Sequence, residues 1–372
     1  MREFIDGSEA IARGALAAGC DFFAGYPITP ASGILVHMLR ELPKVGGVAI
    51  QAEDEIASLG LCIGAAMAGR KAMTATSGPG ISLYSENIGL AVMGEVPLVI
   101  VDCQRMGPAT GGATTVAQGD VQFLRWGTSG GYPIIALAPS TIPECYSLTI
   151  HAFNLAERFR TPVFLATDKE MVLTRATVDV AAYEPVPVTS RRYAPPDAAF
   201  VPYRIAALED VPLFSPIGGP HIVRFTTSTH DEFGYLTKDP AKVERLNRHL
   251  AAKIDAYRDE IAMVKADLEP GARTLLLSYG TTARAMAEAV ALARKDGQKV
   301  SALTVLTLWP VPERAILEAC EGIERVVVAE LNLGQYRLEV ERLAAARGIE
   351  VVGVHRVDGE LITPQEILAH LR

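Results

Sequence analysis

Residues 96–103 have the sequence VPLVIVDC, and the side chains from Leu98 to Val101 are all aliphatic. A strand covered on one face alternates apolar and polar side chains, whereas an unbroken apolar run is typical of a strand buried on both faces. Strands of that kind belong to parallel sheets with helices packed on each side. The run therefore predicts an α/β domain built on a parallel sheet.

Strand and helix patterns alternate on both sides of this run. We expect the other strands at residues 21–25, 47–51, 71–76, 133–138 and 162–167. The helices are expected at residues 8–18, at residues 53–68, after residue 80 through residue 91, and at residues 142–157. Residues 1–185 are thus predicted to form one doubly wound domain with a six-stranded sheet.

The composition changes after this domain, because eight prolines fall between Pro185 and Pro220. That density forbids regular helix or central strand over most of the segment. Residues 239–265 have a charged, helical pattern, so residues 186–268 are predicted to form an extended arm and a connecting helix. Residues 269–372 are predicted to form a second, smaller α/β domain. Its expected strands and helices are strands 274–278, 299–306, 325–330 and 351–356, a helix ending at residue 295, helices 312–320 and 335–347, and a short helix opened by Thr363-Pro364.

The overall composition excludes several classes of protein. Of the 372 residues, 49% are hydrophobic and 21% are charged, which rules out a wholly disordered chain. The net charge of −8 and the lack of a dense basic run argue against a nucleic-acid partner. No apolar run approaches the roughly 18–20 residues of a membrane helix. A signal peptide needs an apolar run near the start of the chain, and four charged residues interrupt any such run here: Glu3, Asp6, Glu9 and Arg13. A cytoplasmic protein is therefore expected.

The five cysteines are widely spaced and contain no C-x-x-C pair. This argues against a disulfide framework, a zinc site or an iron–sulfur cluster within the chain. No two histidines have the i, i+4 spacing of a helical metal pair. We therefore expect no metal site made by this chain alone.

In an open parallel sheet, ligands collect at the carboxyl ends of the strands. The loop at residues 26–30, YPITP, follows the first strand and holds the Thr29 hydroxyl at such an end. The alternative is a rigid loop in which Thr29 or Ser32 caps the next helix.

Three acidic residues, Glu53, Asp54 and Glu55, open the helix after the second strand. They would complement the helix dipole, and that alone could explain them. Glu55, however, precedes a helix of small apolar residues, where a carboxylate would be partly desolvated and its pKa raised. A buried, protonatable glutamate is typical of catalytic sites.

Two further strand-end features suggest ligand contacts. The glycine loop at residues 76–80, TSGPG, runs into a helix and lacks a nucleotide-binding pattern, so it predicts either an anion site or a tight turn against a bulky ligand. Arg105 follows the strand at residues 96–103 and could bind a substrate carboxylate with both nitrogens, or instead contact another subunit. The glycine-rich run at residues 110–115 would suit a mobile or ligand-ordered loop.

Several of these segments, in this order, resemble the α subunit of 2-oxoacid:ferredoxin oxidoreductases, which are thiamine-diphosphate enzymes that include 2-oxoglutarate and pyruvate synthases. The resemblance covers nearly the whole chain. Its most specific segments are GYPITP at residues 25–30, QAEDEIA at 51–57, TSGPG at 76–80, EVPLV at 95–99, QGD at 118–120, THDE at 229–232 and VDG at 357–359. It implies a pyrimidine-binding domain followed by a smaller transketolase-C-like domain.

The resemblance also implies roles for individual residues. Glu55 matches the catalytic glutamate that hydrogen-bonds N1′ of the aminopyrimidine. Thr29 and Arg105 match the positions that hold the substrate carboxylate and carbonyl. The residues implied in cofactor binding are Tyr26, Pro27, Ile28, Glu55, Ser77 and Gly78.

The resemblance implies that the chain works with partners. It lacks the Gly-Asp-Gly…Asn magnesium–diphosphate motif, since Gly119-Asp120-Val121 does not replace it. A β subunit is expected to supply the diphosphate-binding domain, Mg²⁺ and a [4Fe–4S] cluster, and coenzyme A to accept the acyl group. Electrons are expected to pass to ferredoxin or, through another subunit, to a nicotinamide. Met1 lies close to the first helix, so γ and ferredoxin-like components are expected to be separate chains.

Several alternatives remain open at this point. Overall similarity favours 2-oxoglutarate, but Ala31 and the loop at residues 106–112 differ from the commoner family pattern, so pyruvate, branched-chain and aryl 2-oxoacids are also considered. A non-catalytic scaffold subunit would use the proline-rich arm and the helix after it for interaction. A self-contained thiamine decarboxylase or transketolase would need the missing magnesium motif.

Overall fold

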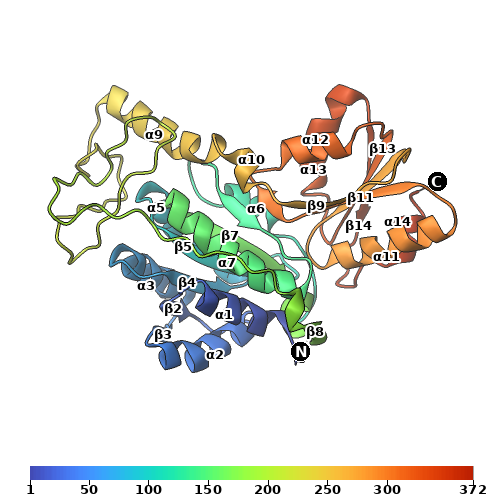
Figure 1. Cartoon of the computed structure of the whole chain (residues 1–372), viewed down its shortest axis with the longest axis horizontal. Helices are drawn as coiled ribbons and strands as arrows, with labels where there is room; N and C mark the ends of the chain where they lie inside the picture. The colour runs from blue at the N-terminus through green and yellow to red at the C-terminus, as the bar shows by residue number, and fades with distance from the viewer. Residues whose placement is uncertain (372) are drawn as a thin grey trace.

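The computed structural model describes residues 1–371, which form two main β-sheets covered by helices (Figure 1). The larger sheet has the strand order β12-β6-β7-β5-β4-β2-β3. Its strands are β2 (Phe22–Gly25), β3 (Val48–Gln51), β4 (Ala72–Thr76), β5 (Leu98–Gln104), β6 (Ile135–Leu137), β7 (Pro162–Asp168) and β12 (Thr307–Trp309). Every residue of β5 is buried, as its unbroken apolar run predicts.

The six strands expected from the sequence are all present and mutually parallel. The expectation of a six-stranded sheet is nevertheless wrong, because β12 adds a seventh strand beside β6. This strand is antiparallel and comes from the C-terminal half of the chain. The three residues of β12 pair with a strand far away in the sequence, and no pattern in the neighbouring residues indicates that pairing.

Helices cover both faces of the larger sheet, which confirms the doubly wound α/β fold. They are α1 (Gly7–Ala17), α2 (Ser32–Glu41), α3 (Glu55–Met67), α4 (Gly78–Leu83), α5 (Ser85–Met93), α6 (Val121–Trp126), α7 (Ile142–Phe159) and α8 (Lys169–Leu173), with the 3₁₀ turn η1 (Leu42–Val45). Side chains of α3, α4 and α5 fill the core on one face. Side chains of α1, α2 and α7 fill the core on the other.

The smaller sheet has the strand order β14-β13-β10-β11-β9. Its strands are β9 (Val264–Asp267), β10 (Thr274–Ser278), β11 (Val300–Val305), β13 (Arg325–Glu330) and β14 (Glu350–His355). The helices around it are α11 (Thr282–Lys295), α12 (Glu313–Ala319), α13 (Arg337–Ala344) and α14 (Pro364–Leu368), with the 3₁₀ turn η3 (Ala345–Arg347). Thr363 and Glu366 form a capping box at the start of α14.

The expected helical segment over residues 239–265 is only partly correct. The structure has α9 (Pro240–Asp255) and α10 (Arg258–Ile261), and then begins the edge strand β9 at Val264. Lys265 and Asp267 of this strand are exposed, so their charges resemble the solvated face of a helix. The sequence also gave no signal for a separate two-stranded sheet of β1 (Arg2–Ile5) and β8 (Ala176–Asp179), which is followed by the 3₁₀ turn η2 (Val180–Ala182).

Residues 183–239 contain no helix or strand, as the run of prolines predicts, and form the long loops beside α9 in Figure 1. A buried ion pair anchors this arm to the larger sheet's helices. Arg191 Nη2 lies 2.5 Å from Glu157 Oε1 of α7, and both side chains are almost fully inaccessible. Arg191 also donates to the carbonyl oxygens of Ala66 and Arg70.

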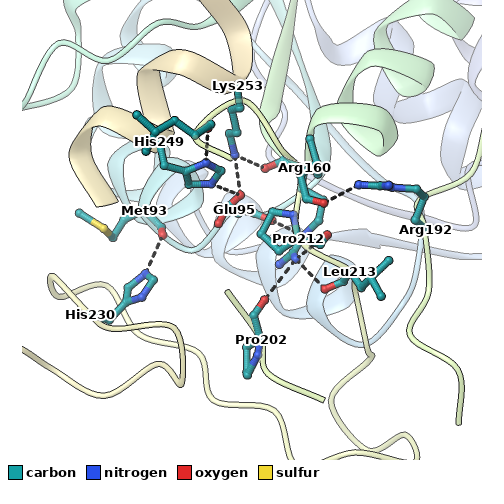
Figure 2. A network of polar contacts seen from close by, with 12 residues as sticks. Met93, Glu95, Arg160, Arg192, Pro202, Pro212, Leu213, His230, His249 and Lys253 are labelled. Carbon is teal, nitrogen blue, oxygen red and sulfur yellow. Dashed lines mark hydrogen bonds and ion pairs between the residues drawn. The ribbon is translucent and has the colours of Figure 1, made fainter. Parts of the chain in front are cut away.

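A second buried cluster attaches α9 to the start of β5 (Figure 2). Lys253 Nζ donates to Glu95 Oε2 at 2.8 Å and to the Arg160 carbonyl oxygen at 3.1 Å. His249 Nε2 contacts the same Glu95 oxygen at 3.2 Å. Although burial opposes it, the charge of Lys253 holds the pKa of Glu95 below its ordinary value.

Within residues 1–371, no helix combines the length and the apolar character that a membrane span requires.

Candidate functional site

Loops that follow β2 and β5 meet at the carboxyl ends of the strands of the larger sheet. Arg105, directly after β5, donates from Nη1 to the Thr29 carbonyl oxygen at 2.5 Å and from Nη2 to the Thr110 carbonyl oxygen at 3.1 Å. Its side chain thereby links the YPITP loop to the glycine-rich loop at residues 110–115. The structure thus brings the two residues predicted to bind substrate, Thr29 and Arg105, into direct contact.

The Arg105 guanidinium is a buried cation, with 6% of the residue exposed. In the described part of the chain, its contacts are carbonyl oxygens and no carboxylate lies within ion-pair distance. Burial lowers the pKa of Arg105, while the more distant charges of Asp120 and Glu55 oppose that shift. Its Nε has no hydrogen-bond partner. Because a buried charge without a direct counter-ion is costly, this position favours an anionic ligand.

Glu55 is the first residue of α3, and only 8% of it is exposed. Its acidic neighbours behave differently. Glu53 is exposed, and Asp54 caps the helix by accepting a hydrogen bond from the Ala57 N–H at 2.7 Å. Asp54 therefore accounts for the helix-dipole interpretation of this cluster, whereas Glu55 is buried and has no hydrogen-bond partner among residues 1–371.

The glycine loop packs directly against Glu55. A Cβ atom at Gly80 would lie 2.0 Å from Thr76 Oγ1, 2.8 Å from Glu55 Cγ and 3.1 Å from Glu55 Oε1, so only glycine fits. The hydroxyl groups of Thr76 and Ser77 are buried and have no partner within the described residues. Since buried hydroxyl groups are normally hydrogen-bonded, these two mark a place for a polar ligand beside Glu55.

The other residues predicted to bind the cofactor lie at the same sheet edge. Tyr26 and Pro27 are exposed, and Ile28 packs against the core lined by α1 and α2. The alternative in which Thr29 or Ser32 caps the next helix is wrong. The helix begins at Ser32 itself and its cap is Ala31, which makes no side-chain cap bond.

Sequence reasoning did not single out two carboxyl groups near this edge, Asp102 and Asp120. Asp102 lies on β5, next to Thr76 of β4 in the register of the sheet, and is fully buried. Burial raises the pKa of Asp102 well above its ordinary value, and the neighbouring Asp120 carboxyl raises it further. The available signal was an aspartate inside a run predicted to be buried on both faces.

Gln118, which sequence reasoning also missed as a functional residue, joins the two sheets. Its Nε2 donates to Asp168 Oδ2 of β7 at 3.2 Å and to the Tyr279 carbonyl oxygen at 3.3 Å. Its Oε1 accepts from the Thr282 hydroxyl at 3.0 Å. Asp168 also caps α8 through the Met171 N–H, a structural role.

A cavity of about 460 Å³ lies between the glycine loop and the second sheet's loops. Its volume is within the range of small-molecule sites. The lining includes Gly78 of α4, Asp120 at the start of α6 and the loop at residues 106–109. From the second domain it includes Leu331, Asn332, Leu333 and Gln335. The carboxyl ends of these strands therefore adjoin a cavity large enough for a ligand.

In residues 1–371, no group of three or more His, Cys, Asp or Glu side chains could hold a metal ion. All five cysteines in that range are buried free thiols.

Comparison with known proteins identifies the class to which this fold and site belong. Residues 13–247 match the thiamine-diphosphate-binding domain of pyruvate flavodoxin/ferredoxin oxidoreductases, and residues 272–367 match core domain II of pyruvate:ferredoxin oxidoreductases. The fold is that of a thiamine-diphosphate-binding oxidoreductase subunit. The chain belongs to the 2-oxoacid:ferredoxin oxidoreductase family, as its motifs predict.

Named relatives extend along nearly the full chain. The 2-oxoglutarate synthase subunit KorA of Methanothermobacter thermautotrophicus is 44% identical over 98% of this chain and 96% of its own. The KorA subunit of Methanocaldococcus jannaschii is 42% identical over 98% of each chain. The ketoisovalerate oxidoreductase subunit VorB of Methanothermobacter marburgensis is 34% identical over 100% of this chain and 97% of its own.

Solved structures agree on the fold. The 2-oxoglutarate:ferredoxin oxidoreductase from Magnetococcus marinus, solved with 2-oxoglutarate, coenzyme A and succinyl-CoA, superposes with a TM-score of 0.92 at 30% identity. The match covers 100% of this chain and 64% of that longer chain. A split-gene transketolase superposes with a TM-score of 0.57 at 12% identity over 99% of this chain and 97% of its own, which shows a shared fold alone.

Proposed function

We propose that this chain is the α subunit of a thiamine-diphosphate-dependent 2-oxoacid oxidoreductase that converts 2-oxoglutarate and coenzyme A to succinyl-CoA and carbon dioxide, with ferredoxin as electron acceptor. The observation that carries the proposal is the buried Glu55 carboxylate, which has no hydrogen-bond partner among residues 1–371 and lies against Gly80. The division into residues 1–185, 186–268 and 269–372 is part of the proposal.

The residues around Glu55 fit the aminopyrimidine ring of thiamine diphosphate. The ring needs an acidic partner, polar hydrogen-bonding groups and a close backbone approach. Glu55, the unpartnered hydroxyl groups of Thr76 and Ser77, and the glycines of the loop offer these three features. Tyr26, Pro27 and Ile28 would border the ring from the neighbouring loop.

Bound thiamine diphosphate would supply a carbon nucleophile and an electron sink for decarboxylation. In this proposal the carboxyl group of Glu55 holds a proton at the ring nitrogen, away from bulk water. The glycine loop covers one side of that side chain, because Gly80 packs against Glu55 Cγ and Oε1. The catalytic contribution of this chain is therefore to position one acid–base group, the Glu55 carboxyl, beside the ring.

Arg105 and Thr29 would orient the substrate. The two carbonyl oxygens that fix Arg105 leave its buried positive charge without a direct counter-ion, and a 2-oxoacid carboxylate would provide one. Two KorA relatives at 42–44% identity support 2-oxoglutarate, and the VorB relative at 34% makes a branched-chain 2-oxoacid the second candidate.

Other parts of the enzyme would come from partners. We propose that a β subunit supplies the diphosphate-binding domain, Mg²⁺ and a [4Fe–4S] cluster, and that γ and ferredoxin-like components are separate chains. The naming of relatives as individual subunits supports a multi-subunit enzyme. We place the complex in the cytoplasm.

The test is a matched pair of variants in the co-purified complex. Glu55→Gln should lower the rate of 2-oxoglutarate-dependent dye reduction, with coenzyme A present, by about 10²- to 10⁴-fold, since that is the usual contribution of an acid–base group. Glu53→Gln, two residues away and exposed, is the control and should retain activity. Equal activity of Glu55→Gln and the control would refute the role of Glu55, and a faster reaction with another 2-oxoacid would reassign the substrate.

A further inference from the structure

The carboxyl groups of Asp102, which is fully buried, and of Asp120, which is partly buried, are neighbours at the end of β5. The Asp120 carboxyl raises the pKa of Asp102, and Asp120 Oδ2 and both Asp102 oxygens are inaccessible to solvent. Neither oxygen of Asp102 accepts a hydrogen bond from any other described residue, and neither does Oδ2 of Asp120. Two neighbouring carboxylates with little access to water repel each other strongly, so we expect the pair to hold at least one proton.

The backbone fixes this pair next to Arg105. The Asp120 N–H donates to Gln104 Oε1 at 3.1 Å, and Gln104 follows Cys103 on the same strand as Asp102. Arg105 is the cation whose charge acts on Asp120, and the charge of Glu55, on α3, acts on Arg105. Asp168, from β7, is engaged instead by backbone N–H groups and Gln118.

Arg105 does not need Asp120 to hold its position, because two backbone carbonyl oxygens already fix the guanidinium. The more distant negative charge of Asp120 balances Arg105 only in part while the site contains no substrate. When a substrate carboxylate takes over that balance, Asp120 becomes a like-charge neighbour of the substrate. The electrostatic cost is removed if Asp120 becomes neutral.

We propose that the Asp102–Asp120 pair takes up one proton when the carboxylate of a 2-oxoacid binds at Arg105; this rests on the proposed function. The proton comes from solvent through the adjoining cavity, forms an O–H bond at Asp120, and returns to solvent when the site empties. Asp102 keeps its own proton throughout and donates a hydrogen bond to Asp120. Both are positioning residues that act through Arg105.

The dependence of substrate binding on pH has a definite direction. Burial raises the pKa of Asp120 to about 6. Above that pH the free enzyme has Asp120 ionised, so substrate binding must include protonation and weakens as the pH rises. Below that pH Asp120 is already neutral and binding loses this dependence. The KM for the 2-oxoacid should therefore rise with pH, by up to about tenfold per unit.

The experiment measures KM for 2-oxoglutarate between about pH 5.5 and pH 8.5 in the co-purified complex. Asp120→Asn keeps the shape and removes the titrating charge, so its KM should be independent of pH and below the wild-type value at pH 8. Asp102→Asn keeps an N–H donor where Asp102 carries its proton, so the wild-type rise in KM should remain. Urea unfolding of each variant checks that it is folded.

Three results would overturn the proposal. They are a wild-type KM that does not change with pH, a rise in KM in Asp120→Asn that matches the wild type, and a flat KM profile in Asp102→Asn. The wild-type measurement decides the matter even if a variant fails to fold. A wild-type complex without turnover on any 2-oxoacid would instead refute the proposed function, so the two failures can be distinguished.

Discussion

Replacing Gly80 with alanine tests the contact between the glycine loop and Glu55. The added Cβ would lie 2.0 Å from Thr76 Oγ1 and 2.8 Å from Glu55 Cγ. Thr76 is a buried, β-branched residue within β4, so its side chain has little freedom to rotate away. Relief of the closest contact requires a shift of about 1 Å in a packed core, and overpacking of this kind costs about 1–3 kcal/mol.

Gly80→Ala should therefore lower the free energy of unfolding of the chain, measured in urea, by about 1–2 kcal/mol after the helix propensity of alanine is included. It should also raise the KM for thiamine diphosphate in the complex, because Glu55 is displaced. Gly60→Ala is the matched control. Gly60 lies inside α3 with no atom within 4 Å of the added Cβ, so this variant should gain about 0.5–1 kcal/mol.

A double variant separates steric conflict from any other cause. Thr76→Ala removes the atom closest to the new Cβ, so Thr76→Ala/Gly80→Ala should lose less stability than the sum of the two single variants. Additive losses would show that the two side chains do not collide. A Gly80→Ala variant with wild-type stability and a wild-type KM for thiamine diphosphate would refute the packing argument altogether.

Two further variants test the substrate site and the buried cluster at α9. Arg105→Lys cannot reach both carbonyl oxygens as a fork, and it should lower kcat/KM for 2-oxoglutarate by about 10- to 100-fold, since a hydrogen bond to a charged group contributes about 1.5–3 kcal/mol; an unchanged kcat/KM would contradict the substrate role. Lys253→Ala removes the ammonium group beside the buried Glu95 carboxylate and leaves it only the His249 contact, so urea unfolding should show a loss of about 3–5 kcal/mol, and a loss below about 1 kcal/mol would contradict this role of Lys253. Because the pKa of Glu95 is lower in the folded state, this interaction stabilises the protein above about pH 4 and is lost as the pH falls further, a dependence that Lys253→Ala should weaken.

The sequence predicts much of the fold because its strands carry local signals. The aliphatic run of β5 and the regular alternation of helices are properties of neighbouring residues. β12 and β9 were missed or misread because short edge strands are defined by their partners. β12 pairs with β6, about 170 residues earlier in the chain, and no local pattern encodes that pairing.

The candidate site divides in the same way. Glu55 could be predicted as buried because a helix of small apolar residues follows it directly in the sequence. The pairing of Asp102 with Asp120 could not, because 18 positions separate them and the intervening loop returns to the sheet only when Gln118 binds Asp168 and Tyr279. Sequence motifs identified the loops, whereas the contacts among them depend on tertiary structure.

Unsatisfied polar groups are distributed unevenly over this protein. Of the fourteen buried side-chain atoms without a partner in residues 1–371, six belong to five residues at the carboxyl ends of β4 and β5, which are Thr76, Ser77, Asp102, Arg105 and Asp120. Arg191 in the arm, by contrast, uses its buried side-chain donors in four hydrogen bonds. Three of these six atoms belong to the Asp102–Asp120 pair, which can satisfy them by sharing a proton. Each of the others, on Thr76, Ser77 and Arg105, costs about 1–3 kcal/mol, and folding alone does not explain that cost at one end of the sheet. Ligands that hydrogen-bond there would recover part of that cost, as the proposed polar ring and substrate carboxylate would do.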